Sequence, residues 1–420
     1  MKIIIAGGGI GGLVAALSLH KAGFEVKVFE SVKEIKPLGV GINLLPHSVR
    51  VLTNLGLQDK IAENAVETKD LVYANKHGQI FWSEPRGRFA GYKWQQFSVH
   101  RGDFQMLLWA EAKRVIGAEN IKVNHHLQAF HSTDNSVTAT FIDRETGKVQ
   151  CHEVGDILIG ADGINSVVRQ KLYPTEGNVK YSGNVLYRGT TLMKPFLTGA
   201  SMVMIGHLGQ KMVVYPIENT LNTEGYQLIN WVGNLREGAD YQLKIRDWNR
   251  QADKQRLVDL YKNWQFDWLN VPEMIENALT TDETTGSGIY EFPMSDRDPL
   301  PRWTFGRVTL LGDAAHPMYP IGSNGASQAI LDADALTNAL VEEPDIDAAS
   351  LRYDNERVPV TGKIVLQNRQ KGPDFIMDLM EERFPNGFSK GEIPHDELEE
   401  IMENYKQVAG FDIQTLNNKI

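Results

Sequence analysis

The chain has 420 residues, of which 42% are hydrophobic and 23% are charged, so it has a globular composition and is long enough for more than one domain. Its formal net charge of -10 argues against nucleic acid or an anionic membrane as the main partner, because both bind clustered Lys and Arg. The one cysteine, Cys151, excludes an internal disulfide and a cysteine-rich metal site.

The same features lead us to expect a cytoplasmic protein without a bound metal. No apolar run approaches the roughly 18 residues that cross a membrane. The first strand begins too early to leave room for a signal peptide, and the low cysteine content suits a reducing compartment. The sequence leaves the oligomeric state open.

The N-terminal stretch KIIIAGGGIGGLVAALSLHKAGFEVKVFE predicts a strand, a tight turn, a helix and a second strand. Gly7, Gly9 and Gly12 lie in the turn with the spacing G-x-G-x-x-G, which allows a tight turn, close approach of a pyrophosphate and helix packing. Glu30 follows the second strand, where an acid can bind the hydroxyls of an adenosine ribose. We therefore expect this unit to bind a dinucleotide.

The rest of the chain predicts two kinds of structure. A helix is expected over 101–116, a hairpin over 137–154, and a buried strand at 157–160. From roughly 175 to 290, successive alternating patterns predict an antiparallel sheet. We place the first part of the dinucleotide-binding domain at 1–175 with a small excursion around 70–100, the β-rich substrate domain at 176–290, the second part of the first domain at 291–345, and a helical C-terminal region at 346–420.

Two later segments carry further signatures. ILIGADGINSVVR (157–169) and LLGDAAHPMYPIGSNGASQAILDADAL (310–336) both continue from a buried strand into a turn. Together with the glycine-rich turn, they resemble the ordered motifs of the flavoprotein aromatic hydroxylases, the single-component FAD monooxygenases. The resemblance implies an α/β fold with a Rossmann-like FAD-binding domain (GR2-type, para-hydroxybenzoate-hydroxylase-like), an inserted antiparallel β-sheet substrate domain and a helical C-terminal region.

The resemblance also implies which residues hold FAD. Asp162, Ser166 and Arg169 would serve FAD, Asp313 would bind the ribityl chain, and Arg101 would lie near the ribityl and phosphate groups. The backbone of Leu127 is expected near adenine. The full set of expected cofactor-binding residues is Gly7, Gly9, Ile10, Gly11, Gly12, Glu30, Val40, Gly41, Arg101, Leu127, Asp162, Ser166, Arg169, Gly312, Asp313, Gly325, Ala326 and Ser327.

The loop after Asp313 would then pass beside the isoalloxazine ring. A helix beginning near Gly325 would point its N-terminus, with about half a positive charge, at the N1–C2=O edge. The backbone N–H groups of Ala326 and Ser327 could donate to that edge. Pro320 and Gly322 would form the wall of the ring, and they are our candidates for a catalytic contribution.

Several stretches, among them SVHRGDFQMLL and FPMSDRDPLPRW, resemble the phenazine-modifying flavin hydroxylases in particular, over approximately residues 1–370. This resemblance implies that NADH or NADPH reduces FAD, that O2 forms a C4a-hydroperoxyflavin, and that one oxygen passes to an aromatic ring. The expected substrate is a phenazine carboxylate, with or without decarboxylation. Candidate substrate contacts are Tyr187, Arg188, Met204, Tyr215 and Trp231.

Other interpretations remain open at this stage. A salicylate- or nicotinate-type hydroxylase would carry the same motifs, and Trp231, Tyr215 and Arg188 also suit a purely structural role. A non-catalytic escort protein of the same fold and an NAD-dependent dehydrogenase are weaker alternatives. His316 could act as a general base, although a structural loop histidine is the simpler interpretation. The tail beyond Lys371 could cover the active site, form an interface or do neither.

Overall fold

The computed structural model describes residues 1–37, 40–238, 241, 250–279 and 288–418. Its first layer is a parallel sheet of five strands in the order β20-β12-β1-β2-β8. The strands are short, rich in Val, Ile and Leu, and largely buried, as is usual for a parallel sheet covered on both faces. They span Lys2–Ala6 (β1), Glu25–Phe29 (β2), Ile121–Lys122 (β8), Ile157–Gly160 (β12) and Val308–Leu310 (β20).

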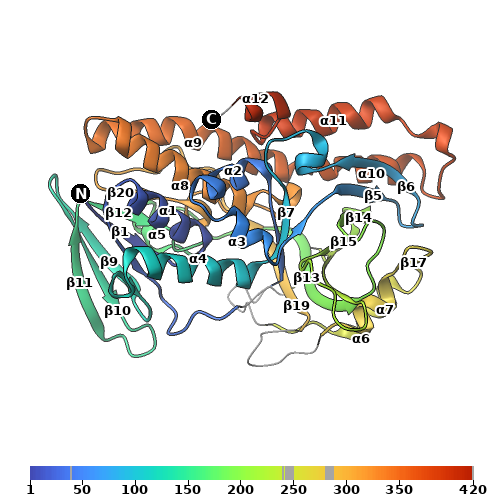
Figure 1. Ribbon diagram of the computed structural model, residues 1–420, viewed down its shortest axis with the longest axis horizontal. Helices are drawn as coiled ribbons and strands as arrows, with labels where there is room; N and C mark the ends of the chain where they lie inside the picture. The colour runs from blue at the N-terminus through green and yellow to red at the C-terminus, as the bar shows by residue number, and fades with distance from the viewer. Residues whose placement is uncertain (38–39, 239–240, 242–249, 280–287, 419–420) are drawn as a thin grey trace.

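Helices pack around this sheet (Figure 1). Among them, α1 follows β1 and α5 follows β12, each after a short turn. The expected helix near Gly325 is confirmed and begins at that residue. The main helices of this part are α1 (Ile10–Lys21), α4 (Arg101–Ile116), α8 (Gly325–Glu342) and α9 (Ile346–Arg369). The shorter ones are α2 (Pro46–Asn54), α3 (Gln58–Ala62) and α5 (Val167–Leu172).

The second layer is a seven-stranded sheet in the order β19-β13-β16-β15-β14-β5-β6, antiparallel except for the β14–β5 pair. It draws strands from outside the range 176–290, because β5, β6 and β19 also belong to it. The strands span Asp70–Ala74 (β5), Ile80–Pro85 (β6), Lys180–Met193 (β13), Ser201–His207 (β14), Gln210–Pro216 (β15), Gln227–Arg236 (β16) and Tyr290–Asp296 (β19).

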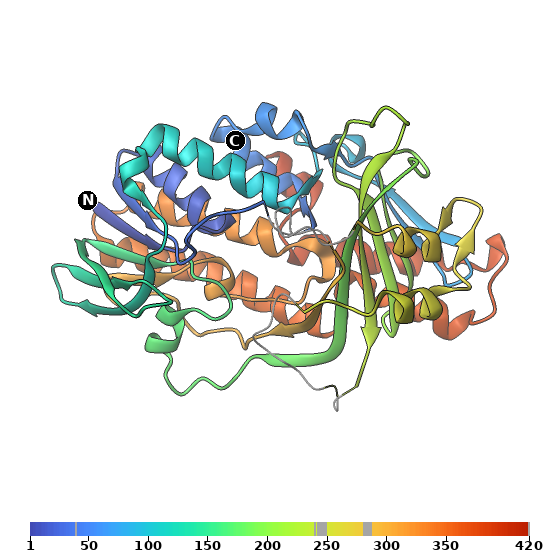
Figure 2. The same cartoon turned by 90° about the horizontal axis from the view of Figure 1, so that it is seen from below.

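The two faces of this sheet meet different partners. One face, here called the outer face, packs against α6 (Lys254–Tyr261) and α7 (Val271–Glu276). The other, the inner face, packs against the C-terminal helices α10 (Phe375–Arg383) and α11 (His395–Val408). Figures 1 and 2 show α6 and α7 beside the sheet, with α10 and α11 on its other side. The tail therefore forms part of the core that covers the inner face.

Smaller sheets complete the fold. The hairpin expected at 137–154 is confirmed by the antiparallel pairing of β10 and β11. No helix among the described residues is both long and apolar enough to cross a bilayer. The remaining elements are β3 (Gly41–Leu44), β4 (Val66–Glu67), β7 (Phe97–His100), β9 (His126–Ser132), β10 (Val137–Ile142), β11 (Val149–Gly155), β17 (Gln265–Phe266), β18 (Leu269–Asn270) and α12 (Ile413–Asn417).

Candidate functional site

The glycines of the first turn divide into two roles. At Gly7, where φ is +114°, an added Cβ would lie 2.2 Å from the carbonyl oxygen of Ala161. At Gly12 it would lie 2.1 Å from the carbonyl oxygen of Gly7, so these two glycines permit the turn and the packing of α1. At Gly9, the residue before α1, a Cβ would meet no atom within 4 Å. Gly9 therefore leaves the helix N-terminus open to a phosphate.

Two neighbouring positions of α1 serve packing more than ligand contact. Ile10 is buried, and a Cβ on Gly11 would lie 2.8 Å from Cδ2 of Leu311, just before the third motif. Leu127 in β9 is also buried, which leaves its backbone as the part that can meet a ligand. These placements keep α1 close to the strand that leads to Asp313.

Glu30 lies directly beside the glycine turn. Its Oε2 accepts a hydrogen bond from the Gly8 N–H at 2.7 Å, and its Oε1 accepts one from the Val32 N–H at 2.9 Å. The carboxylate and the open N-terminus of α1 therefore share one edge of the parallel sheet, as a ribose and a pyrophosphate require.

Asp313 and Arg101 lie near enough for their charges to interact, and the space beside these two side chains is here called the recess. Water reaches both side chains, and neither makes a hydrogen bond to another residue in the described part of the chain. Burial by the surrounding protein nevertheless raises the pKa of the Asp313 carboxyl, although His316 and Arg101 oppose the rise. Burial also lowers the pKa of the Arg101 guanidinium, and the Asp313 charge partly offsets this. Protein surrounds these opposite charges without satisfying their hydrogen bonds, so the recess suits a ligand with hydroxyl and phosphate groups.

The strand β3 borders this recess. The carbonyl oxygen of Val40 accepts a hydrogen bond from the Arg101 N–H at 2.9 Å. The Gly41 N–H donates to Oδ1 of Asn230 at 2.7 Å, and a Cβ on Gly41 would lie 2.6 Å from the ring of Tyr215. Gly41 thus brings the first layer against the inner face of the second sheet.

The N-terminus of α8 closes another side of the site. Gly312 has a φ of +63° and turns the chain toward Asp313. Asn324, the residue before α8, makes no side-chain cap, so the N–H groups of Gly325 and Ala326 stay available. The Ser327 hydroxyl is instead 3.0 Å from the hydroxyl of Ser48. This uncapped helix end has the polarity expected for the flavin edge.

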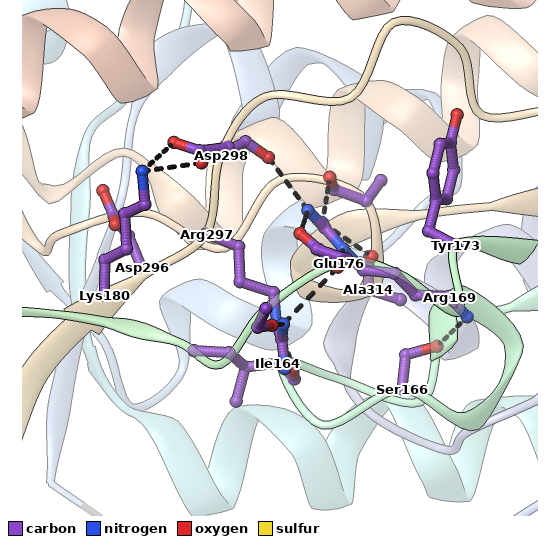
Figure 3. Close-up of polar contacts among 12 residues, drawn as sticks. Ile164, Ser166, Arg169, Tyr173, Glu176, Lys180, Asp296, Arg297, Asp298 and Ala314 are labelled. Carbon is purple, nitrogen blue, oxygen red and sulfur yellow. Dashed lines mark hydrogen bonds and ion pairs between the residues drawn. The ribbon is translucent and has the colours of Figure 1, made fainter. Parts of the chain in front are cut away.

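The polar side chains of the second motif, residues 157–169, bond to other parts of the protein (Figure 3). The Ser166 hydroxyl accepts the Arg169 N–H at 2.9 Å and so caps α5, while Asp162 accepts the Val167 N–H at 2.7 Å. The Arg169 side chain is 1% exposed, donates to the carbonyl oxygen of Ala315 at 2.7 Å and pairs with Glu176 at 2.6 Å. Protein oxygens thus occupy the donors of Arg169, so its side chain has a structural role in this arrangement, and its expected service to FAD stays a prediction. It holds the backbone that follows Asp313.

Three of the five substrate candidates share the inner face. Arg188, Met204 and Tyr215 all point there, since Arg188 pairs with Val232 and Tyr215 with Asn230 in the strand register. The Arg188 guanidinium lies 5.3 Å from the ring of Phe292, and its buried Nε has no hydrogen-bond partner among the described residues. Burial lowers the pKa of Arg188, which the nearby Tyr215 opposes. Arg188 is thus a half-buried cation that has no carboxylate partner in the part of the chain that the structure describes.

Tyr187 and Trp231 belong to the outer face, which corrects their assignment as substrate contacts. The Tyr187 hydroxyl donates to Glu237 at 2.8 Å, and the Trp231 indole N–H donates to the Thr191 hydroxyl at 3.0 Å. Both rings lie in the core under α6 and α7. Successive side chains alternate across a strand, so Tyr187 points away from the recess into which Arg188 points.

His316 is a structural residue. Its Nε2 lies 2.6 Å from Oδ2 of Asp332, and the ring is 3% exposed. Although burial acts in the opposite direction, His316 and Arg357 hold the pKa of Asp332 below its ordinary value. The partner of His316 is the buried carboxylate of Asp332. In the sequence, Asp332 is an acid among the apolar residues of a predicted helix, and this pattern could have indicated a buried ion pair.

A pocket that no sequence pattern predicted lies beside the loop that precedes α8. Tyr73 of β5, Met204 of β14 and Gly322 of the loop line it together with Tyr405 and Phe411 from the tail. No sequence pattern linked the tail to the loop, since the contact depends on how α11 folds back. At Gly322 an added Cβ would lie 2.1 Å from the Tyr405 hydroxyl, so Tyr405 covers the residue expected to line the flavin. Pro320, the other expected wall residue, is exposed.

Comparisons with known proteins agree with this geometry. Residues 1–368 match the family model for the FAD binding domain. The phenazine 1,6-dicarboxylic acid hydroxylase PhzS of Lysobacter antibioticus is 39% identical over 371 residues, covering 88% of this chain and 89% of that protein. The 6-hydroxynicotinate 3-monooxygenase of Bordetella bronchiseptica is 29% identical over 376 residues, covering 86% of this chain and 89% of that protein. Klebsiella pneumoniae HpxO, solved with FAD and uric acid, has a TM-score of 0.73 at 23% identity, covering 99% of this chain and 96% of that one.

The match confirms the expected α/β fold, FAD as the cofactor and the class of enzyme. The geometry of the site also fits FAD without these comparisons. The open N-terminus of α1, Glu30 and the recess of Asp313 and Arg101 lie along one edge of the parallel sheet. A dehydrogenase or a non-catalytic escort protein has no need of that combination. The chain therefore belongs to the FAD binding domain family, and within it is an FAD-dependent aromatic monooxygenase.

Proposed function

We propose that the chain hydroxylates a phenazine carboxylate, using NADH or NADPH and O2, in the cytoplasm. The observation that carries the choice of substrate is the half-buried guanidinium of Arg188 on the inner face, whose buried Nε has no hydrogen-bond partner among the described residues. A buried donor without a partner is costly, and an aromatic carboxylate would supply both the charge and the hydrogen-bond acceptor.

The cofactor would be held by residues of the first layer. Its pyrophosphate would lie at Gly9, its adenosine ribose at Glu30, and its ribityl chain between Asp313 and Arg101. The N–H groups at the start of α8 would face its N1–C2=O edge. When bound there and reduced by NAD(P)H, FAD would supply the activation of O2 and the transfer of one oxygen atom to the aromatic ring.

The protein's own contribution would be to orient the substrate and exclude water. Arg188 would hold the carboxylate, while Met204 and Tyr215 would offer apolar surfaces to a flat ring system. The similarity to a protein named a phenazine 1,6-dicarboxylic acid hydroxylase supports the phenazine class.

A smaller aromatic acid is the second candidate. Arg188 would serve any aromatic carboxylate, and the relative named a 6-hydroxynicotinate 3-monooxygenase shows that related chains act on single rings. Ring size therefore separates the two candidates.

The test is the rate of NADH consumption in air by the purified, FAD-loaded protein, with hydrogen peroxide measured in parallel. The compounds are phenazine-1,6-dicarboxylate, N-methylated phenazine-1-carboxylate, salicylate and 6-hydroxynicotinate. We expect a phenazine to stimulate NADH consumption strongly with little peroxide. Stimulation by a single-ring acid alone would overturn the phenazine assignment.

A further inference from the structure

The C-terminal tail reaches the loop that precedes α8. The tail helix α11 packs on the inner face through Leu398 and Met402, and its last turn places Tyr405 against the loop. Phe411 packs edge-on to Tyr405, with ring centroids 6.4 Å apart. A segment beyond the family match therefore touches the loop expected beside the flavin.

The contact with the loop is close. The missing side chain of Gly322 leaves room for the Tyr405 ring, whose Cζ lies 2.5 Å from where a Cβ would stand. The Tyr405 hydroxyl lies 3.4 Å from the carbonyl oxygen of Ile321 and 3.5 Å from Oδ1 of Asn368. Because these two distances are long, the ring contributes mainly by packing and the hydroxyl by little.

The loop needs such support. Gly322 has a φ of +72° and Ser323 a φ of +53°, so two successive residues adopt the left-handed conformation. A side chain such as that of Ser323 is strained there and keeps this conformation only where its surroundings hold it. Asn368 adds a second restraint by donating to the carbonyl oxygen of Tyr319 at 3.0 Å.

The tail also touches the first turn of α8. The Gln328 side-chain amide donates to the carbonyl oxygen of Ala409 at 3.3 Å, and Oε1 of Gln328 accepts from Arg357 at 2.6 Å. A buried ion pair between Lys211 and Asp374 ties the start of the tail to the inner face. The tail is thus fastened to both structures that flank the expected position of the flavin edge.

We propose that Tyr405 is a positioning residue that holds the loop 320–324 and the start of α8 in place for the flavin ring. The inference rests on the proposed function, since it assigns this loop to the flavin. Loss of the Tyr405 ring would release the loop, admit water beside the flavin and divert reducing equivalents from substrate to hydrogen peroxide.

The first experiment measures hydrogen exchange of the backbone amides of residues 321–327 in the FAD-free protein. We expect Tyr405→Ala to speed this exchange by about 10-fold or more, as a loop loses protection when its packing partner is removed. Tyr405→Phe keeps the ring and should stay near wild type. Tyr92→Phe is the matched control, because the Tyr92 hydroxyl donates to the carbonyl oxygen of Phe411 at 2.6 Å and no bond from that hydroxyl to the loop is recorded among the described residues.

The second experiment measures peroxide released per NADH consumed in the FAD-loaded variants with the best substrate. We expect the coupled rate of Tyr405→Ala to fall by about 10- to 100-fold with peroxide taking its place, while Tyr405→Phe and Tyr92→Phe stay coupled. If Tyr405→Ala does not fold, Tyr405→Leu tests the same contact, since it removes the ring but keeps a buried apolar side chain.

The outcomes separate the two proposals. Unchanged exchange at 321–327 in Tyr405→Ala or Tyr405→Leu would overturn the positioning role, whatever the substrate is. Faster exchange with unchanged coupling would also overturn it, because the loop would then be irrelevant to the flavin. A wild-type protein that hydroxylates no phenazine would instead contradict the proposed substrate and leave the exchange result valid.

Discussion

At the scale of single residues, the site depends on charges that lack protein partners. Arg188 is half-buried, and its buried Nε has no hydrogen-bond partner among the described residues, whereas Arg169 is buried and fully paired. A buried donor without a partner is expensive unless a ligand completes it, and the Arg169 arrangement is an ordinary structural ion pair. This contrast supports our proposal that Arg188 binds the substrate while Arg169 serves the scaffold, although the sequence alone presents both as plausible ligands.

Arg188 yields the first prediction. Arg188→Met should weaken binding of an aromatic carboxylate by about 10- to 100-fold, the cost of losing a charge-assisted hydrogen bond. Arg188→Lys should recover part of the loss, because it restores the charge but not the planar geometry. Titration of the flavin absorbance with substrate measures both values. Equal affinity in Arg188→Met and wild type would exclude Arg188 as the carboxylate ligand.

Asp313 yields a prediction about pH. Folding raises the pKa of this carboxyl through burial, so the native state holds its proton more tightly and the ionised group opposes folding. The destabilisation begins as the pH rises past the ordinary value of 3.8 and is complete above the raised pKa. Asp313→Asn should therefore stabilise the FAD-free protein at neutral pH and lose that advantage near pH 3.8.

Thermal unfolding of the two FAD-free proteins across this pH range checks the sign. The same substitution should weaken FAD binding by about 10-fold, since it removes a charged acceptor for the ribityl hydroxyls. A variant that is less stable than wild type at neutral pH would contradict the assignment of Asp313 to an unsatisfied recess.

At the scale of elements, the sequence predicts local structure well and side-chain direction poorly. The glycine turn, the hairpin of β10 and β11, and the start of α8 follow from residue pattern, because turns and helix ends have local chemical causes. The opposite directions of Tyr187 and Arg188 depend on which face the helices α6 and α7 cover. That packing joins residues far apart in the sequence, so no local sequence pattern specifies it.

The helix α5 gives a prediction at this scale. Ser166→Ala should cost about 1 kcal/mol of stability, the usual value of a helix N-cap, and should leave FAD affinity within about twofold, since its hydroxyl bonds to Arg169 N–H. Asp345→Ala is a matched control, because Asp345 caps α9 by accepting the Ala348 N–H at 2.8 Å. A selective loss of FAD affinity in Ser166→Ala would restore the cofactor-contact role expected from the sequence.

At the scale of the whole molecule, the active site that we propose combines segments far apart in sequence. The first layer would supply Glu30, Arg101 and Asp313, and the inner face would supply Arg188 and Tyr215. The tail then covers that face, as Figure 1 shows. Resemblance indicated the first two parts. For the tail, covering of the site was one of several open alternatives, and the sequence could not decide among them because amphipathic helices do not specify the surface on which they pack.

The tail yields a prediction for the molecule as a whole. Met377 of α10 is fully buried against the inner face, so Met377→Ala should cost about 2–5 kcal/mol of stability. Urea unfolding measures the loss, and the exposed Leu351 on α9 provides a control in Leu351→Ala, which should change stability little. Equal free energies of unfolding for the two variants would show that the tail is not part of the hydrophobic core.

We propose that this chain places one atom of O2 on a phenazine carboxylate. Mass spectrometry of the product formed from phenazine-1,6-dicarboxylate, NADH and isotopically labelled O2 by the FAD-loaded protein tests this proposal. We expect a hydroxylated phenazine that carries one labelled oxygen atom from O2 and none from water. An unlabelled product, or NADH consumption that yields only peroxide with every phenazine tested, would contradict it.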